Sequence, residues 1–461
     1  MKNRLYPIVL LSLSILGCAN NNPLSSYNDE TTTRISKIYN GNLNIAMQEE
    51  SSDSPLYNME YGTIQRLQSN YESSNIYFNR AQNIIDIWAA SWQSTTSGET
   101  YRTMTSLLIN DNVNDYQPRG YEKTFLTTFH ALNHLDLNNW ANARIEIKRM
   151  YQIEEAIQNY NQATYNQAKI DLEKEKSSAK NGYLYDQVSK QYDFSDINSP
   201  QVLALKNSYQ NAFSHYLAGF VFEALNEPSL ARPGYLKAGQ LQPSSTLIQN
   251  SIDNIDKNIR PKANTTDLLI VQEVGHAPQI KSKEINIPIQ LSNVPCMNQI
   301  TIFYPTLVND SSNQPLYNFN LDGKSVVPSP MVNVDLMAAR SLSDEKTHII
   351  IRNIGAAIRN ISAMQAICLQ NNSSSLALFG GTVIVLGSLA IDKADERNWN
   401  MLPSKININR INLPYGNHSF DITINGVKYT KQINLNQPYQ VLVYRVLGNQ
   451  VYFEPQRGMS N

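Results

Sequence analysis

The chain has 461 residues, a formal net charge of -1, 41% apolar residues and only 17% charged residues. Because nucleic-acid binders carry a marked excess of Lys and Arg, this balance argues against a nucleic-acid partner. The length allows about three domains of ordinary size, and the apolar content is that of a folded chain.

The first residues predict a lipoprotein signal. Lys2 and Arg4 form a short positive region, residues 5–16 are an apolar run of signal-peptide length, and Ile15-Leu16-Gly17-Cys18 ends it. This tetrapeptide resembles a bacterial lipobox, in which the cysteine is acylated and the chain is cut before it. The alternatives are an ordinary cleaved signal peptide or an uncleaved anchor, but the run is short for a span of about 20 residues.

The lipobox implies a location for the protein. Acyl chains on Cys18 would hold the protein at a membrane, since each buried CH₂ contributes about 0.8 kcal/mol. Ala19 is not Asp, and by resemblance to the lipoprotein sorting rule this implies the outer membrane, with the protein facing the periplasm. Residues 1–17 are therefore the predicted signal peptide. The polar residues 18–54 are predicted to be a tether with a short helix at 34–48.

Two further cysteines, Cys296 and Cys368, follow Cys18. An oxidising periplasm permits a disulfide between them. Two buried free thiols are the alternative, because the sequence does not show whether their Cα atoms lie within about 7 Å. Neither cysteine has another cysteine or a histidine at metal-ligand spacing, so we expect no zinc there.

Residues 55–260 are predicted to be an all-helical domain of tetratricopeptide-like repeats. The clearest repeat spans 201–243, where Gly219 and Ala231 permit a close helix crossing, Phe222 and Tyr235 fill the groove beside it, and Pro243 ends the second helix. A generic helical bundle is the alternative, since its helices also cross at small residues.

Two earlier stretches have similar internal spacing. Residues 56–92 place Gly62, Phe78 and Ala81 at the same relative positions, and a hairpin beginning at residue 121 places Ala131 and Ala143 there. The second helix of this later hairpin is predicted to continue as a long polar helix to about residue 176, and a further helix is expected at 101–108.

After residue 261 the pattern changes to short alternating strands. Strands are predicted at 267–273, 284–291, 300–304, 316–321, 405–411, 418–424, 427–435, 441–446 and 451–453, with helices at 335–342 and 347–370. Asn425-Gly426 is a strong hairpin signal. The predicted fold class is therefore α+β, with helical repeats followed by a β-rich domain at 261–461 that contains a few helices. The uncharged run 376–391 is expected to be a buried helix, with a docking segment or a membrane span as alternatives.

No nucleophile elbow, phosphate loop, dinucleotide fingerprint or His-Glu-x-x-His motif occurs in the sequence, so no cofactor and no metal are expected. His130 and His134 share a helical face, but no carboxylate stands at ligand spacing beside them, and we interpret them as packing or surface residues. Two clusters remain of interest, the turn 274–278 with His276 and the segment 392–403 with Asp395 and Arg397.

These clusters also carry a resemblance. The order of lipobox, degenerate repeats, Val-Gly-His-Ala-Pro (274–278), Ala-Asp-Glu-Arg-Asn-Trp-Asn-Met-Leu-Pro (394–403) and Leu-Pro-Tyr-Gly-Asn-His (413–418) resembles a family of largely uncharacterised tetratricopeptide lipoproteins of Gram-negative bacteria. The resemblance covers nearly the whole mature chain. It implies work in the cell envelope, in association with lipoproteins that activate peptidoglycan synthases.

Two hypotheses of function follow. In the first, the protein is a non-enzymatic adaptor, and a helical-repeat groove binds an envelope protein such as the peptidoglycan synthesis machinery. Its groove is expected to be lined by exposed residues, namely Tyr61, Gln65, His134, His215 and Tyr216. In the second, the protein is an envelope or peptidoglycan-modifying enzyme with a site near His276, Asp395 and Arg397.

Overall fold

The computed structural model describes residues 23–44, 54–93, 116–177, 185–186, 188–288, 299–308, 316–370 and 394–453. The predictions for Cys18, Cys296, the helix at 101–108 and the apolar run 376–391 lie outside these residues, and the side chain of Cys368 is not described either. Within the described residues, no helix is both long enough and apolar enough to cross a bilayer.

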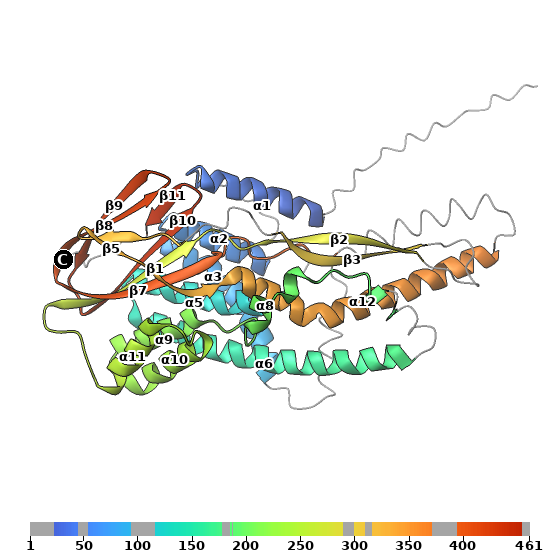
Figure 1. Cartoon of the computed structure of the whole chain (residues 1–461), viewed down its shortest axis with the longest axis horizontal. Coiled ribbons are helices and arrows are strands. Elements are labelled where there is room, and N and C mark those ends of the chain that lie inside the picture. The colour runs from blue at the N-terminus through green and yellow to red at the C-terminus, as the bar shows by residue number, and fades with distance from the viewer. Residues whose placement is uncertain are drawn as a thin grey trace, which may run out of the picture.

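Three antiparallel helical hairpins form the amino-terminal half (Figure 1). They are α2 (Pro55–Leu67) with α3 (Tyr71–Gln93), α5 (Gly120–Asp136) with α6 (Trp140–Ser177), and α9 (Ala212–Ala224) with α10 (Pro228–Leu241), and α11 (Thr246–Asp256) follows. Each turn holds one residue at positive φ two positions after the first helix, namely Ser69, Asn138 and Asn226. This left-handed residue closes the helix end, so the three hairpins share one turn geometry.

The predicted close crossings are confirmed by the packing around the glycines. A Cβ on Gly62 would lie 2.5 Å from the Phe78 ring, and one on Gly219 would lie 2.6 Å from the Tyr235 ring. Gly234 faces Gly219 so closely that its Cβ would lie 2.7 Å from the Gly219 backbone nitrogen. These positions therefore admit only glycine without a shift of the helices.

The first helix of the third hairpin begins later than the sequence pattern predicts. A short helix, α8 (Pro200–Ala204), precedes it, and a 3-10 turn, η1 (Asp196–Asn198), comes just before α8. Asn207 accepts hydrogen bonds from the backbone nitrogens of Tyr209 and Gln210, so it favours a turn over a helix here. Asn211 then caps α9 by accepting from Ser214 N at 2.8 Å.

The carboxy-terminal half is built on two stacked sheets and a ribbon. The first sheet has the order β11-β10-β1-β7-β6, the second has the order β5-β4-β8-β9, and β2 and β3 form a two-stranded ribbon. The strands are β1 (Thr265–Val274), β2 (Gln279–Pro288), β3 (Gln299–Val308), β4 (Phe319–Leu321), β5 (Lys324–Val326), β6 (Ser329–Asn333), β7 (Lys405–Pro414), β8 (Gly416–Ile424), β9 (Val427–Leu435), β10 (Tyr439–Leu447) and β11 (Gln450–Phe453). The Asn425-Gly426 turn joins β8 and β9, and both residues have positive φ as predicted.

Strand β1 is the centre of a three-layer arrangement. It pairs in parallel with β10 and antiparallel with β7. Leu269 and Val271 point into the core shared with the helices, whereas Leu268 and Ile270 point into the core under the second sheet. Since the helical core continues onto the sheet, the described residues on the two sides of position 261 pack as one body.

Two further predicted element boundaries are wrong. The helices expected at 335–342 and 347–370 are a single helix, α12 (Val334–Gln370), because the polar residues between them include no glycine or proline to end it. The region predicted as a tether contains α1 (Pro23–Tyr39), which begins earlier than the helix expected at 34–48. Its buried face includes Thr31 and Arg34, polar residues that a hydropathy pattern does not mark.

Helix α1 packs on the folded body at both ends. Asn28 donates to the Ile280 carbonyl of β2 at 3.1 Å, and Tyr452 of β11 donates to the Ile38 carbonyl at 2.6 Å. Residues 23–39 are therefore not a tether. The predicted fold class is confirmed, since the amino-terminal half is helical and the carboxy-terminal part is β-rich.

The crossing of α9 and α10 yields a stability test. We expect Gly234→Ala to lower the free energy of unfolding by about 1–3 kcal/mol, because the new methyl group would press on the backbone of α9. Gly239→Ala, in the same helix, is the matched control, since its Cβ would have ordinary contacts beginning at 3.5 Å. Chemical denaturation of both variants measures the difference, and equal stabilities would contradict the close crossing.

Candidate functional site

The groove residues predicted from the sequence do not form one exposed surface. Tyr61 and Gln65 are half-buried on α2, and His134 is half-buried on α5. His215 and Tyr216 are 1% and 0% exposed, so the prediction that they line an open groove is wrong. The reason is the position of α9, whose residues 212–223 are all buried between neighbouring elements.

The two buried residues have structural partners instead. His215 Nε2 lies 3.1 Å from the Glu154 carboxylate of α6, and the Tyr216 hydroxyl lies 2.8 Å from the Ser251 hydroxyl of α11. Tyr61 packs edge-on against Tyr77 with ring centroids 4.6 Å apart. These polar and aromatic residues are predicted to lie at the surface, but they form contacts between helices.

The residues of the enzyme hypothesis are likewise used structurally. His276 is buried, its Nδ1 lies 2.8 Å from the Ala277 carbonyl, and its ring packs against Tyr39. Asp395 pairs with Arg397 at 2.8 Å. His276 and Asp395 therefore contact different residues, and these contacts do not join them in one site.

The segment around Trp399 is held by two buried glutamates that the sequence analysis did not single out. Glu122 of α5 accepts from Trp399 N at 2.7 Å, and Glu60 of α2 accepts from Asn400 N at 2.7 Å. Both glutamates are 0% exposed, and burial raises the pKa of Glu60. No local spacing could reveal these contacts, because their partners lie far apart in the chain.

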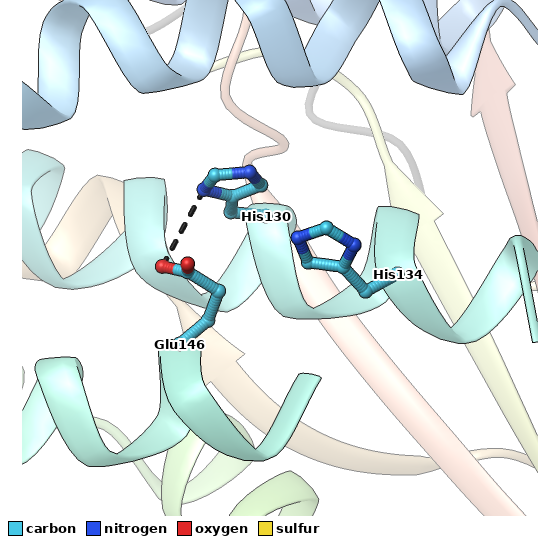
Figure 2. A group of neighbouring side chains, drawn as sticks. All are labelled: His130, His134 and Glu146. Carbon is cyan, nitrogen blue, oxygen red and sulfur yellow. Dashed lines mark ion pairs between the residues drawn. The ribbon is translucent and has the colours of Figure 1, made fainter. Parts of the chain in front are cut away.

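One group of side chains has the composition of a metal site. His130 and His134 of α5 lie beside Glu146 of α6, and one candidate ligand atom from each lies within 4.8 Å of the others (Figure 2). The sequence around the two histidines offers no carboxylate at ligand spacing. The α5–α6 hairpin supplies that carboxylate from the facing helix.

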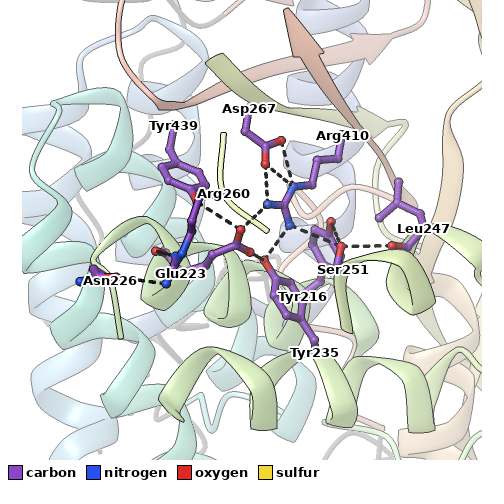
Figure 3. A network of polar contacts seen from close by, with 10 residues as sticks. All are labelled: Tyr216, Glu223, Asn226, Tyr235, Leu247, Ser251, Arg260, Asp267, Arg410 and Tyr439. Carbon is purple, nitrogen blue, oxygen red and sulfur yellow. Dashed lines mark hydrogen bonds and ion pairs between the residues drawn. The ribbon is translucent and has the colours of Figure 1, made fainter. Parts of the chain in front are cut away.

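A second polar cluster lies where the third hairpin meets the first sheet (Figure 3). Arg410 of β7 lies at its centre, with Nη2 2.7 Å from Glu223 of α9 and 2.6 Å from Asp267 of β1. Arg410 Nη1 donates to the Tyr235 hydroxyl at 2.9 Å. Although burial opposes ionisation, Tyr235, Tyr216 and Asp267 hold the pKa of Arg410 well above its ordinary value. Arg410 therefore joins the helical and sheet halves as a permanent cation.

Two pockets open beside this cluster, and we call them the junction pockets. One has a volume of about 470 Å³ and the other about 550 Å³. They share Glu223, Arg260 and Pro261. The smaller pocket is lined by Trp140, Leu225, Pro438 and Tyr439 among others, and the larger by Leu247, Asn250, Lys262 and Arg410 among others.

Arg260, which lines both pockets, and Lys262, which lines the larger one, supply positive charge beside the pockets. Arg260 is half-buried and donates to the Glu223 carbonyl and to Asn226 Oδ1, both at 3.0 Å, so it caps the end of α9. Lys262 is exposed. The mainly apolar wall of the smaller pocket, next to Arg260 and Lys262, suits a ligand with an apolar group beside a carboxylate.

The Arg410 cluster predicts a strong effect on stability. Arg410→Met leaves Glu223, which is 1% exposed, without its cation, and we expect a loss of about 3–5 kcal/mol in the free energy of unfolding. Arg232→Met is the control, because the Arg232 pair with Asp256 is exposed and its loss should be undetectable. Urea denaturation of the two variants measures the difference, and an equally stable Arg410→Met would refute the structural role.

No protein-family model, no curated protein and no solved structure matches the chain. The likeness to tetratricopeptide lipoproteins stays an expectation from sequence motifs. Any function must accordingly be argued from the residues of this chain.

Proposed function

We propose that this protein is an outer-membrane lipoprotein on the periplasmic side, where it works as a non-enzymatic adaptor. It binds an extended segment of an envelope protein, with the peptidoglycan synthesis machinery as the partner class that the motif resemblance implies. The segment lies in the junction pockets and not in the helical groove expected from the sequence. The single observation that supports this proposal best is the pair of adjacent pockets lined from both halves.

The lining of the pockets favours a peptide with an apolar side chain beside an acidic group. Trp140 and Tyr439 are half-buried and offer aromatic faces to an apolar side chain in the smaller pocket. Arg260 and Lys262 offer cations to a carboxylate at the rim. Aromatic and arginine side chains are the residue types that contribute most to protein recognition.

The anchor would place these pockets away from the membrane. Helix α1 begins beside β2 and ends beside β11, as the contacts of Asn28 and Ile38 require. In Figure 1, α9, α10 and α11 lie toward the β11 end of the long axis. Because an extended chain advances at most about 3.6 Å per residue, acylated Cys18 would keep the start of α1 close to the bilayer. The junction pockets then point into the periplasm.

A photo-crosslinking experiment tests the binding site. A photoreactive amino acid at Asn250, which is exposed and lines the larger pocket, should capture one discrete envelope protein in cells. The neighbouring exposed position Gln249, outside the lining of both pockets, is the matched control and should capture little. Mass spectrometry of the adduct identifies the partner.

The charge of the rim supplies the second arm of this experiment. Lys262→Glu should weaken the Asn250 adduct at least about tenfold, because it places a negative charge where the partner's carboxylate binds. Lys257→Glu makes the same charge change at an exposed position outside both pockets and should leave the adduct intact. Equal adducts from Asn250 and Gln249, or equal effects of the two charge reversals, would reject the junction pockets as the binding site.

The proposed anchor has its own test. Cys18→Ala should abolish incorporation of labelled palmitate and release the protein from the membrane fraction, because no acyl chain then holds it. Fractionation of cells that express the wild type or the variant, followed by immunoblotting, measures the shift. A variant that stays with the outer membrane would contradict lipid anchoring at this residue.

A further inference from the structure

The α5–α6 hairpin brings together side chains of the types that ligate metal ions. His130 and His134 stand one turn apart on α5, and their rings stack with centroids 4.8 Å apart. Glu146 projects from α6 toward them, with its Oε2 3.4 Å from His130 Nδ1 (Figure 2). Two imidazoles at i,i+4 with a carboxylate from a facing element are a donor set typical of divalent transition metals.

The ligand atoms of this group are largely buried and in part unpaired. His130 is 1% exposed and Glu146 is 4% exposed. Among the described residues, three ring nitrogens have no hydrogen-bond partner, namely both nitrogens of His130 and Nδ1 of His134. The 3.4 Å approach to Glu146 is an ion-pair distance without hydrogen-bond geometry. Buried polar atoms are normally satisfied, and a metal ion bound between the two rings and the carboxylate would satisfy these nitrogens.

We propose that His130, His134 and Glu146 bind a zinc ion whose fourth coordination position is open to water. The ligand atoms would need to close from 4.8 Å to about 3.4 Å, the separation that bonds of about 2.0–2.2 Å impose on a tetrahedral site. His134 is half-buried, so its side chain has room to turn toward the ion. The same partial exposure provides the path for the metal and for its water ligand.

Neighbouring residues hold the ligands in place. Arg149 donates to both carboxylate oxygens of Glu146, at 2.5 and 2.6 Å, and orients them. Phe78 packs edge-on against the His130 ring with centroids 6.2 Å apart. Asn133, between the two histidines, donates to Ser74 and Asn75 of α3 and fixes the rotation of α5. Such support around the ligands is what metal sites require.

Metal binding to the full chain tests the proposal. After treatment with a chelator, the protein should bind one equivalent of Zn²⁺ in isothermal titration calorimetry and should gain several degrees in melting temperature. Substituted Co²⁺ should give the intense visible absorption of a tetrahedral site. His134→Gln and Glu146→Gln should each lower the affinity at least about a hundredfold.

Two controls keep the result interpretable. His418→Gln removes another imidazole next to a carboxylate, that of Asp322, in the second sheet, and it should bind zinc as the wild type does. The apo forms of all variants are compared by circular dichroism, and His134→Gln, at a half-buried position, should fold normally. Absence of zinc binding by the wild type, or binding that survives both ligand variants, would overturn the proposal.

Discussion

A buried ion pair between Arg66 of α2 and Glu273 of β1 is the joint on which the architecture depends. The two side chains are 2% and 1% exposed and lie 2.7 Å apart, and Arg445 of β10 lies 3.8 Å from the same carboxylate. Burial lowers the pKa of Arg445 to about 10 even beside Glu273. Since an unpaired buried charge costs about 3–5 kcal/mol, none of these elements can fold away from the others. The helical half and the sheet half therefore form one cooperative unit, although their sequence patterns change sharply near residue 261.

A buried glutamate in each helical hairpin also contacts the carboxy-terminal half. The first helix of each hairpin carries a buried glutamate, Glu60 in α2, Glu122 in α5 and Glu223 in α9. Glu60 and Glu122 accept backbone N–H groups of the segment around Trp399, and Glu223 accepts from Arg410. Each hairpin thus has a polar anchor in the carboxy-terminal half as well as its apolar packing. Apolar packing tolerates sliding, whereas a hydrogen-bonded carboxylate fixes register, so these contacts define how the repeats sit on the sheet.

What could be predicted from the sequence is local. The spacing of Gly62 and Phe78, and of Gly219 and Tyr235, encodes contacts between consecutive helices, and Asn425-Gly426 encodes its own turn. The contacts that make the candidate sites join distant residues, such as Glu223 with Arg410 or Glu122 with Trp399. Residue type alone predicts the exposure of buried polar residues poorly. His215, for example, is predicted to lie at the surface but is buried. The ligand set of His130, His134 and Glu146 was missed for a related reason, because the carboxylate comes from the next helix.

Helix α6 links the two candidate sites physically. Glu146 faces α5 through His130, and Glu154, about two turns further along, faces α9 through His215 at 3.1 Å. Helix α9 in turn carries Glu223, which lines both junction pockets. His130 and Glu146 already lie 3.4 Å apart, so an ion bound between them would hold the α5–α6 crossing as it is. The helix that carries Glu146 and the pockets beside the third hairpin are thus joined by a continuous series of buried contacts through α6 and α9.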